Sequence, residues 1–244
     1  MSRYYYDLHI HSCLSPCADN DCTPGNIVGM GVLNGLGIMA LTDHNTCRNC
    51  PAFFSAAKQY GIIPIAGMEL TTAEDIHVVF LFRELAQALE FDKLVSERKP
   101  RIPNRTDIFG DQLIIGEDDK VVGTEEFFLS NATDIPIEET AALAERYGAI
   151  CYPAHIDREA NGILAVLGML PPRPDFRCVE INRPEKVAEL TQAHRLGGKH
   201  IIVSSDAHYL WDIKEQREYF ELDDEPYSSA LVRQRLFEYL EGTE

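Results

Sequence analysis

Residues 4–12 read YYYDLHIHS, an apolar run that turns polar at its end and carries two histidines, His9 and His11. A second pair, Asp206 and His208, follows the apolar run IIVSS near the other end of the chain. Residues two apart on a strand point to the same face of a sheet, so each pair offers two metal-binding groups in one direction. A fold that brings the first and last strands together would build a polynuclear metal site from these pairs.

Short apolar runs alternate with helical segments along most of the chain. We predict strands at 4–10, 38–41, 62–66, 77–82, 149–153, 178–181 and 200–204, and helices at 23–36, 51–60, 83–96, 137–146, 184–196 and 226–241. The gap between the third and fourth strands is too short for a helix, so these two strands are predicted to form a hairpin. Seven strands, mostly followed by helices, predict an α/β fold built as a distorted, closed or nearly closed (β/α)7 barrel.

Polar residues that can bind metals gather at or just beyond the C-terminal ends of these predicted strands. They are His9, His11, His44, Glu69, His155, Asp206 and His208. In α/β barrels this face carries the chemistry. His77 opens its strand instead, but the predicted hairpin would return it beside Glu69.

The segment 97–133 differs from the rest of the chain. It is polar, and a hairpin is predicted inside it between 113–115 and 121–122. We interpret residues 1–244 as a single barrel domain from which this segment makes an excursion. As a hypothesis, the excursion is a lid over the barrel mouth, and a helix at 226–241 ends the chain.

The composition limits the partners and the compartment. A formal net charge of −17 argues against a surface for duplex nucleic acid or anionic membranes, but a small anionic substrate is compatible with bound divalent cations. Met1-Ser2-Arg3 runs straight into the first strand, so no signal peptide is expected, and no apolar run is long enough to span a bilayer. The oligomeric state stays open.

Seven cysteines is an odd number outside a secretory context, which predicts reduced thiols and a cytoplasmic protein. Cys47 and Cys50 form a C-x-x-C, typical of a zinc or redox site. No second C-x-x-C completes a tetrahedral set, so free thiols in a loop near the metal site are the favoured interpretation.

Several short motifs occur in a defined order. They are D-L-H-I-H-S at 7–12, L-T-D-H-N at 41–45, G-M-E at 67–69, His77, P-A-H at 153–155 and S-D-A-H at 205–208. In this order the chain resembles the PHP (polymerase and histidinol phosphatase) family, from about Tyr4 to Tyr209 and excluding 97–133. The resemblance implies a distorted seven-stranded barrel that holds up to three divalent metals.

Matched motif by motif, the resemblance also implies three ligand sets. These are His9, His11, Glu69 and Asp206 for the first metal, Glu69, His77 and His155 for the second, and an aspartate with His44 and His208 for the third. The aspartate comes from the loop after His11, where family members usually place it soon after a serine. Here Pro-Cys-Ala separates Ser15 from Asp19, and we predict Asp19 in preference to Asp21.

The ligand types predict the chemistry. Imidazole and carboxylate suit Zn, Mn or Fe. A carboxylate shared by two ions holds them close, and a bridging water that loses its proton becomes the nucleophile, while the ions bind phosphate oxygens. The chain is therefore expected to be a metal-dependent phosphoric ester hydrolase that acts on a small phosphorylated metabolite.

The resemblance favours a nucleotide as that metabolite, for example a nucleoside 3′,5′-bisphosphate. Histidinol phosphate is the alternative substrate. A non-catalytic, metal-binding regulatory module is the alternative from another class of protein.

Other residues are predicted to support the reaction. We predict Asp7, Asp43 and Arg158 as catalytic residues, with the two carboxylates orienting ligands or a water. Arg158, Arg183 and Asn182 are predicted to bind substrate, because a guanidinium fits a phosphate group in a bidentate manner. The alternative for each aspartate is a structural hydrogen bond, and for each arginine a surface ion pair.

Overall fold

The computed structural model describes residues 1–243. Its strands are β1 (Ser2–Asp7), β2 (Ile38–Leu41), β3 (Ile63–Thr71), β4 (His77–Phe82), β5 (Leu113–Ile115), β6 (Val121–Thr124), β7 (Ala149–Pro153), β8 (Cys178–Glu180), β9 (His200–Ile202) and β10 (Tyr219–Leu222). Its α-helices are α1 (Pro24–Leu33), α2 (Cys50–Tyr60), α3 (Leu85–Arg98), α4 (Thr106–Phe109), α5 (Ile137–Arg146), α6 (Ile163–Leu167), α7 (Val187–Ala193) and α8 (Ser229–Glu241). Two 3-10 helices are η1 (Pro184–Lys186) and η2 (Leu210–Asp212).

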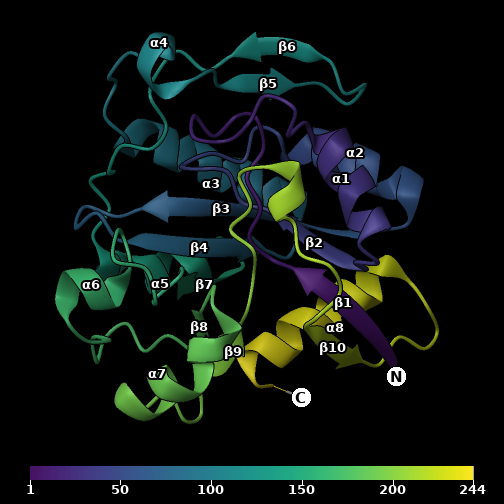
Figure 1. The fold of residues 1–244 in the computed structure, drawn as a ribbon, viewed down its shortest axis with the longest axis vertical. Coiled ribbons are helices and arrows are strands. Elements are labelled where there is room, and N and C mark those ends of the chain that lie inside the picture. The colour runs from purple at the N-terminus through teal and green to yellow at the C-terminus, as the bar shows by residue number, and fades with distance from the viewer. Residues whose placement is uncertain (244) are drawn as a thin grey trace.

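A curled, mixed sheet forms the centre of the α/β fold (Figure 1). Its strand order is β10-β1-β2-β3-β4-β7, while β8 and β9 form a separate parallel pair. The predicted hairpin of β3 and β4 is confirmed, and β4 also pairs antiparallel with β7. All seven predicted core strands are therefore present, although they do not alternate strictly with helices.

The exact seven-stranded (β/α)7 barrel is not confirmed. The β8–β9 pair is joined to the main sheet on both sides by hydrogen bonds from loop segments and not by strand pairing. On one side of the β8–β9 pair, Ile156 N–H donates to Glu180 O at 2.9 Å. On the other side, His11 N–H donates to Ala207 O at 2.9 Å. The sequence prediction also missed β10, which pairs antiparallel with the first residues of β1 and occupies that edge of the sheet.

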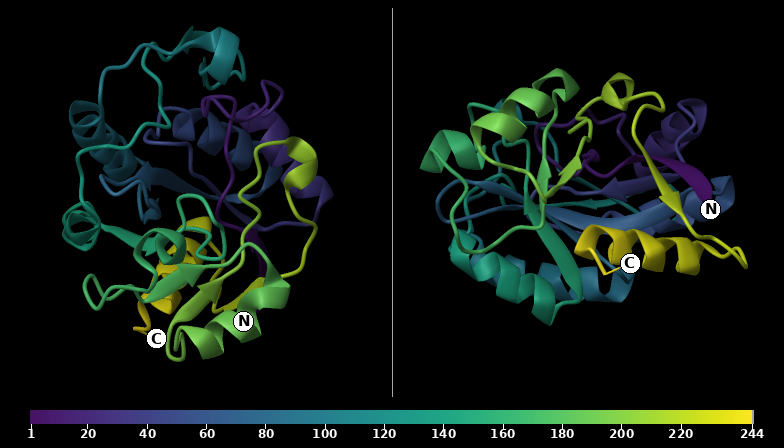
Figure 2. Two further views of the ribbon diagram at one scale, coloured as in Figure 1. Left: turned by 60° about the vertical axis from the view of Figure 1, so that its left-hand side comes forward. Right: turned by 90° about the horizontal axis from the view of Figure 1, so that it is seen from below.

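The two faces of the sheet pack against different helices. On one face, Met39 of β2 and Phe80 of β4 pack with α1, α2 and α3. On the other face, Ile65 of β3 and Leu81 of β4 pack with Leu236 and its neighbours on α8. Figure 2 shows α8 lying along the sheet beside the N-terminal strand. This second face also carries Glu69 and His77, since side chains two apart on a strand share a face.

Several element boundaries differ from the prediction for physical reasons. β3 continues to Thr71 because its pairing with β4 extends to His77, so Glu69 lies inside the strand and not beyond it. The helix predicted from 226 begins at Ser229, after the Ser228 hydroxyl caps Leu231 N–H. The helix predicted at 184–196 is instead η1 followed by the short α7.

The segment 97–133 contains α4 and the predicted hairpin, β5–β6 (Figure 1). Its backbone N–H groups donate hydrogen bonds to residues of the neighbouring loops. Leu113 N–H donates to Cys13 O at 2.8 Å, and Ile115 N–H donates to Asn49 Oδ1 at 2.9 Å. In the part of the chain that the structure describes, no helix is both long and apolar enough to span a membrane.

Candidate metal centre

Glu69 lies at the centre of a buried cluster of imidazoles. Its Oε1 is 2.8 Å from His77 Nδ1 and 2.9 Å from His155 Nε2. Its Oε2 is 3.2 Å from His11 Nε2 and 3.0 Å from His44 Nδ1. His9 Nε2 also lies 3.4 Å from Oε1, so Glu69 contacts imidazoles from all three predicted ligand sets, as a carboxylate shared between metals would.

The first and last strand segments supply the first group of ligand atoms. His9 Nε2 and His11 Nε2 lie 3.1 Å apart, and each is 3.3 Å from Asp206 Oδ1. Together with Glu69 these residues can hold one metal ion. This group is the set predicted for the first metal.

Two further groups lie beside the first. Glu69, His77 and His155 converge as predicted for a second metal, with His77 Nδ1 3.3 Å from His155 Nε2. His44 and His208 converge with His11 in a group that can hold another ion. Side chains far apart in the sequence thus meet in a His/Glu/Asp cluster able to bind metal ions, while the number and identity of the ions remain predictions.

Neighbouring polar groups fix the protonated nitrogen of three of these histidines. His9 Nδ1 donates to Glu180 Oε1 at 2.9 Å. His11 Nδ1 donates to Ser15 Oγ at 2.9 Å, and His208 Nδ1 donates to the carbonyl of Asp206 at 2.8 Å. With Nδ1 engaged in this way, Nε2 is the nitrogen that each imidazole presents to the cluster, where it can bind a metal once it carries no proton.

Glu180 is a functional residue that the sequence prediction missed. It is fully buried, and it accepts hydrogen bonds from His9 Nδ1 and from the backbone N–H of His155 at 3.1 Å. The sequence offered one signal for it, a lone carboxylate in the apolar strand CVEI at 178–181. A buried strand tolerates a carboxylate only if its charge is paired.

The predicted catalytic aspartates hold the ligand loops and do not line the main cavity. Asp43 accepts from Ser12 N–H at 2.7 Å and from the Ser15 hydroxyl at 2.8 Å, and Ser15 in turn accepts from His11. Asp7 accepts from Ser205 N–H at 3.1 Å, which ties β1 to the segment that carries Asp206. Both act on the site through other residues.

Charges inside the cluster oppose the effect of burial. Burial disfavours the anion of Glu69, but the imidazoles of His77, His9 and His44 hold its pKa well below its usual range. The pKa of Asp206 is also lowered, because the charge of His9 outweighs burial. Burial lowers the pKa of His77 to about 4 in spite of Glu69. Anionic carboxylates and a neutral imidazole at pH 7 are the states that metal binding requires.

Buried ligand atoms that face only other ligand atoms indicate that a cation fits this centre. His44 Nδ1, Glu69 Oε2 and Asp206 Oδ1 are buried and make no hydrogen bond within residues 1–243, although each lies 3.0–3.3 Å from another ligand atom of the cluster. Native proteins rarely leave buried polar atoms unpaired. His155 and Asp206 also have positive φ angles of 28° and 54°, a strained conformation that is common at functional sites.

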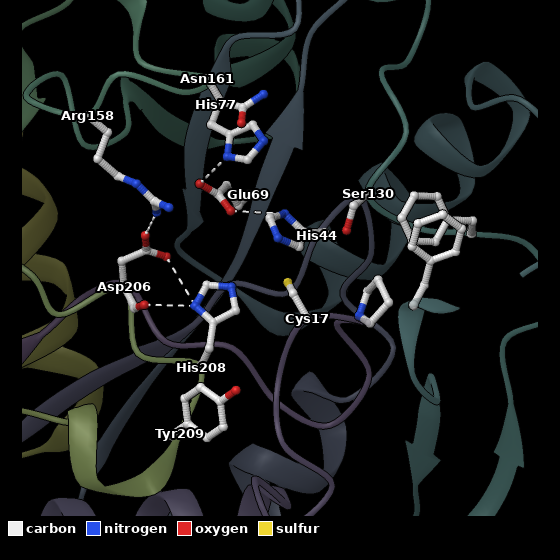
Figure 3. Close-up of a pocket in the computed structure, with 13 residues that line it drawn as sticks. Cys17, His44, Glu69, His77, Ser130, Arg158, Asn161, Asp206, His208 and Tyr209 are labelled. Atoms are coloured by element: carbon white, nitrogen blue, oxygen red, sulfur yellow. Dashed lines mark hydrogen bonds and ion pairs between the residues drawn. The ribbon is translucent and has the colours of Figure 1, made fainter. Parts of the chain in front are cut away.

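A cavity of about 450 Å³ opens above the cluster (Figure 3). Glu69, His77 and Asp206 line one part of it, and Arg158 points into it while its guanidinium donates to Asp206. Segment 97–133 supplies an aromatic wall and a hydroxyl. The remaining lining residues are Pro16, Cys17, His44, Phe109, Phe128, Ser130, Asn161, His208 and Tyr209.

Arg183, Asn182 and Asp19 belong neither to the ligand groups nor to the lining of this cavity. Arg183 Nε donates to Asp157 Oδ2 at 2.8 Å, and Asn182 Nδ2 donates to Ser204 O at 3.1 Å. Neither lines the main cavity, and their contact with substrate stays a prediction. Asp19 Oδ1 accepts from Asp21 N–H at 2.8 Å and is absent from the ligand groups found in residues 1–243.

The C-x-x-C pair is buried in the hydrophobic core. Cys47 and Cys50 both pack against Gly67, whose carbonyl lies 3.2 Å from Cys47 Sγ and 3.7 Å from Cys50 Sγ. Both thiols are free. Their contacts are those of small core residues and Cys50 begins α2, whereas the favoured interpretation placed both thiols in a loop near the metal site.

Comparison with known proteins identifies the family. Residues 7–156, more than half of the chain, match the model of the PHP domain, so the chain belongs to the PHP domain family. This places it in a superfamily of metal-dependent phosphoesterases and nucleases. A 5′-3′ exoribonuclease from Haemophilus influenzae is 35% identical over 91 residues, which are 36% of this chain and 29% of that protein. The chain thus matches less than a third of the length of this relative.

Solved structures share the fold over most of the chain. The lesion-specific endonuclease Q from Pyrococcus furiosus matches with a TM-score of 0.68 and 17% identity, and the match covers 100% of this chain and 57% of that one. A putative metal-dependent phosphoesterase from Bifidobacterium adolescentis matches with a TM-score of 0.55 and 16% identity, covering 83% and 87% of the two chains. At these identities the likeness establishes the fold.

The net charge led us to expect that the chain binds no duplex nucleic acid, and this expectation is wrong. Endonuclease Q, in complex with a 27-mer duplex that has an abasic lesion at its active site, matches all of this chain with a TM-score of 0.66. The net charge of −17 is a sum over the whole surface. It does not describe the local field at a site lined by histidines and Arg158, where bound cations would reverse the sign.

Proposed function

We propose that this protein hydrolyses a phosphate ester of a nucleotide with the aid of divalent metals held by the His/Glu/Asp cluster. The observation that supports the proposal most directly is the position of Glu69, whose two oxygens contact imidazoles from all three predicted ligand sets at the base of a cavity. When bound, the metals would supply a water of lowered pKa and neutralise charge that develops on the phosphate.

The chain's own residues provide the rest of the site. Arg158 is half-exposed and reaches into the cavity, where its guanidinium can bind phosphate oxygens as a bidentate donor. In the structure it is paired with Asp206. Substrate binding would therefore exchange this partner for phosphate while Asp206 turns to its metal.

Aromatic side chains support a nucleotide over an aliphatic phosphate. Phe109 and Phe128 line the cavity with ring centroids 4.3 Å apart, and Tyr209 lines it and stacks on Trp211 at 4.9 Å. Base–aromatic stacking contributes on the order of 1–3 kcal/mol per base. A nucleoside 3′,5′-bisphosphate would place one phosphate at the cluster and its base against one of these rings.

A second candidate is cleavage of a phosphodiester in a nucleic acid. The fold shared with endonuclease Q and the sequence similarity to a 5′-3′ exoribonuclease favour it. The same metal chemistry serves both reactions, because each is an in-line displacement at phosphorus.

A substrate panel tests both candidates. The purified protein, loaded with Mn²⁺ or Zn²⁺, is offered p-nitrophenyl phosphate, a nucleoside 3′,5′-bisphosphate, histidinol phosphate, short oligonucleotides and a duplex with an abasic lesion. Phosphate release that is fastest from the bisphosphate supports the first candidate, and chain scission without phosphate release supports the second. Turnover of histidinol phosphate alone would contradict both, as would no turnover with either metal from neutral to alkaline pH.

A further inference from the structure

The loop after β1 places a thiol beside the third group of histidines. Among the seven cysteines, all of which lie in the described part of the chain, Cys17 is the exposed one. It lines the cavity, and Figure 3 shows its sulfur directed at the space between the rings of His44 and His208. Both imidazoles are close enough to the thiol to interact with it electrostatically.

Both imidazoles are arranged as ligands that lack an ion. His208 Nδ1 is committed to the carbonyl of Asp206 at 2.8 Å, which leaves its Nε2 free. His44 is buried, and its Nδ1 lies 3.0 Å from Glu69 Oε2, which leaves its other ring nitrogen for the third site. One ligand atom each of His11, His44 and His208 lie within 4.8 Å of one another. These three histidines form a group that could hold a cation, independently of the cysteine.

The aspartate expected to complete this site is engaged elsewhere. Asp19 Oδ1 accepts from Asp21 N–H at 2.8 Å, while the backbone N–H of Asp19 donates to His208 O at 2.9 Å. The residue thus fastens the loop beside His208, and its carboxylate caps a turn. Cys17, two residues earlier, presents its side chain to the cavity instead.

We propose that Cys17 is a thiolate ligand of the third metal together with His44 and His208, and that this site takes a thiophilic ion such as Zn²⁺ in preference to Mn²⁺. The proposal rests on the metal dependence in the proposed function. On binding, the S–H bond of Cys17 gives its proton to solvent and a sulfur–metal bond forms. Thiolate and imidazole together are a common zinc ligand set, whereas Mn²⁺ prefers oxygen ligands.

The wild-type protein allows a direct test through the reactivity of the thiol. Metal-free protein is treated with iodoacetamide, with and without saturating Zn²⁺ or Mn²⁺, and alkylation of each cysteine is followed by peptide mass spectrometry. We expect Cys17 to react fastest without metal and to be protected about tenfold or more by Zn²⁺, because a metal-bound thiolate is a weaker nucleophile than a free one. Equal alkylation rates with and without Zn²⁺ would overturn the proposal.

Cobalt substitution identifies the ligand atom. The Co²⁺ protein should show a thiolate-to-metal charge-transfer absorption in the near ultraviolet, and C17S should lose this absorption and one bound metal. C17D should regain the metal without the absorption. D19N, and C151S as the matched cysteine control, should keep both. Loss of the metal from D19N but not from C17S would assign the site to the aspartate.

These readouts do not depend on turnover. A protein that hydrolyses none of the tested phosphate esters would contradict the proposed function, yet a thiolate–cobalt absorption that depends on Cys17 would still support this ligand. Conversely, an active enzyme without that absorption would overturn only the assignment of Cys17.

Discussion

Glu180 Oε1 lies 2.9 Å from His9 Nδ1, and both side chains are fully buried. The carboxylate sits on β8 and the imidazole follows β1, so this hydrogen bond joins the separate β8–β9 pair to the main sheet. It also directs His9 Nε2 toward Glu69 and Asp206, at 3.4 and 3.3 Å. Glu180 therefore positions His9, a predicted ligand of the first metal.

Replacing Glu180 should weaken metal binding more than it changes the fold. We expect E180A to lower affinity for the first metal by about 10–100-fold, the usual range when a partner of a ligating histidine is removed. E180Q keeps an acceptor for His9 Nδ1 and should lose less. Isothermal titration of metal-free protein measures both affinities. An unchanged affinity in E180A would show that His9 is oriented without this carboxylate.

The two chain ends should serve different metals. H9A should deplete the first metal, because His9 contacts Glu69 and Asp206, whereas H208A should deplete the third, because His208 lies with His44 and His11. Metal counting by mass spectrometry, with each variant dialysed against the same buffer, checks this. Loss of the same ion from both variants would contradict the division.

Arg158 should contribute to substrate binding. Removing a charge-assisted hydrogen bond of about 1.5–3 kcal/mol predicts a fall of roughly 10–100-fold in kcat/KM for R158A. Steady-state kinetics on the best substrate of the panel measures the change. R3A is a suitable control, since Arg3 pairs with Glu221 on the exposed β1–β10 edge. A fall in kcat/KM no larger than that of R3A would remove Arg158 from the substrate site.

Phe109 should matter for nucleotides and not for small phosphate esters. F109A removes part of the aromatic wall, so we expect KM to rise about 5–100-fold for a nucleotide, on the basis of stacking energies of about 1–3 kcal/mol, and to stay constant for p-nitrophenyl phosphate. I108A changes an exposed neighbour that does not line the cavity and serves as the matched control. An equal effect of F109A on both substrates would indicate a general disturbance of the segment 97–133.

Asp7 should make stability depend on pH. Burial raises its pKa to about 6, and one of its oxygens has no hydrogen bond within residues 1–243. In the unfolded chain the carboxyl ionises near its ordinary pKa, so between that value and about 6 the folded state holds the extra proton. The free energy of unfolding therefore falls as pH rises through this window, by at most about 3 kcal/mol.

Denaturant unfolding of metal-free wild-type protein and D7N at pH 4 and pH 7.5 tests this relation. The quantity of interest is the free energy of unfolding of D7N minus that of wild type. Because D7N cannot ionise, this difference should be more favourable to D7N at pH 7.5 than at pH 4. The same difference between the two proteins at both pH values would show that Asp7 does not titrate in this window.

The sequence by itself determined the local elements and the residues available for chemistry. Strand His77–Phe82 and helix Ile137–Arg146 begin and end where the pattern predicts, because apolar runs, prolines and glycines act within a few residues. Eight of the nine predicted metal ligands converge for a related reason: strand ends and motif order limit where a side chain can go. Asp19 is the exception. Its carboxylate accepts a hydrogen bond within a turn, and the spacing of residues in the motif does not reveal that turn.

Only the tertiary structure decided which side chains meet where the β8–β9 pair joins the main sheet. Pairing of β10 with β1 and closure by loops at Ile156 and Ala207 depend on long-range hydrogen bonds that no local pattern encodes. The contact of Glu180 with His9, 171 residues apart, and the direction of Cys17 between His44 and His208 depend on the same closure. Residue types could be recognised from the chain alone, but partners could not, because a partner is set by the path of the whole backbone.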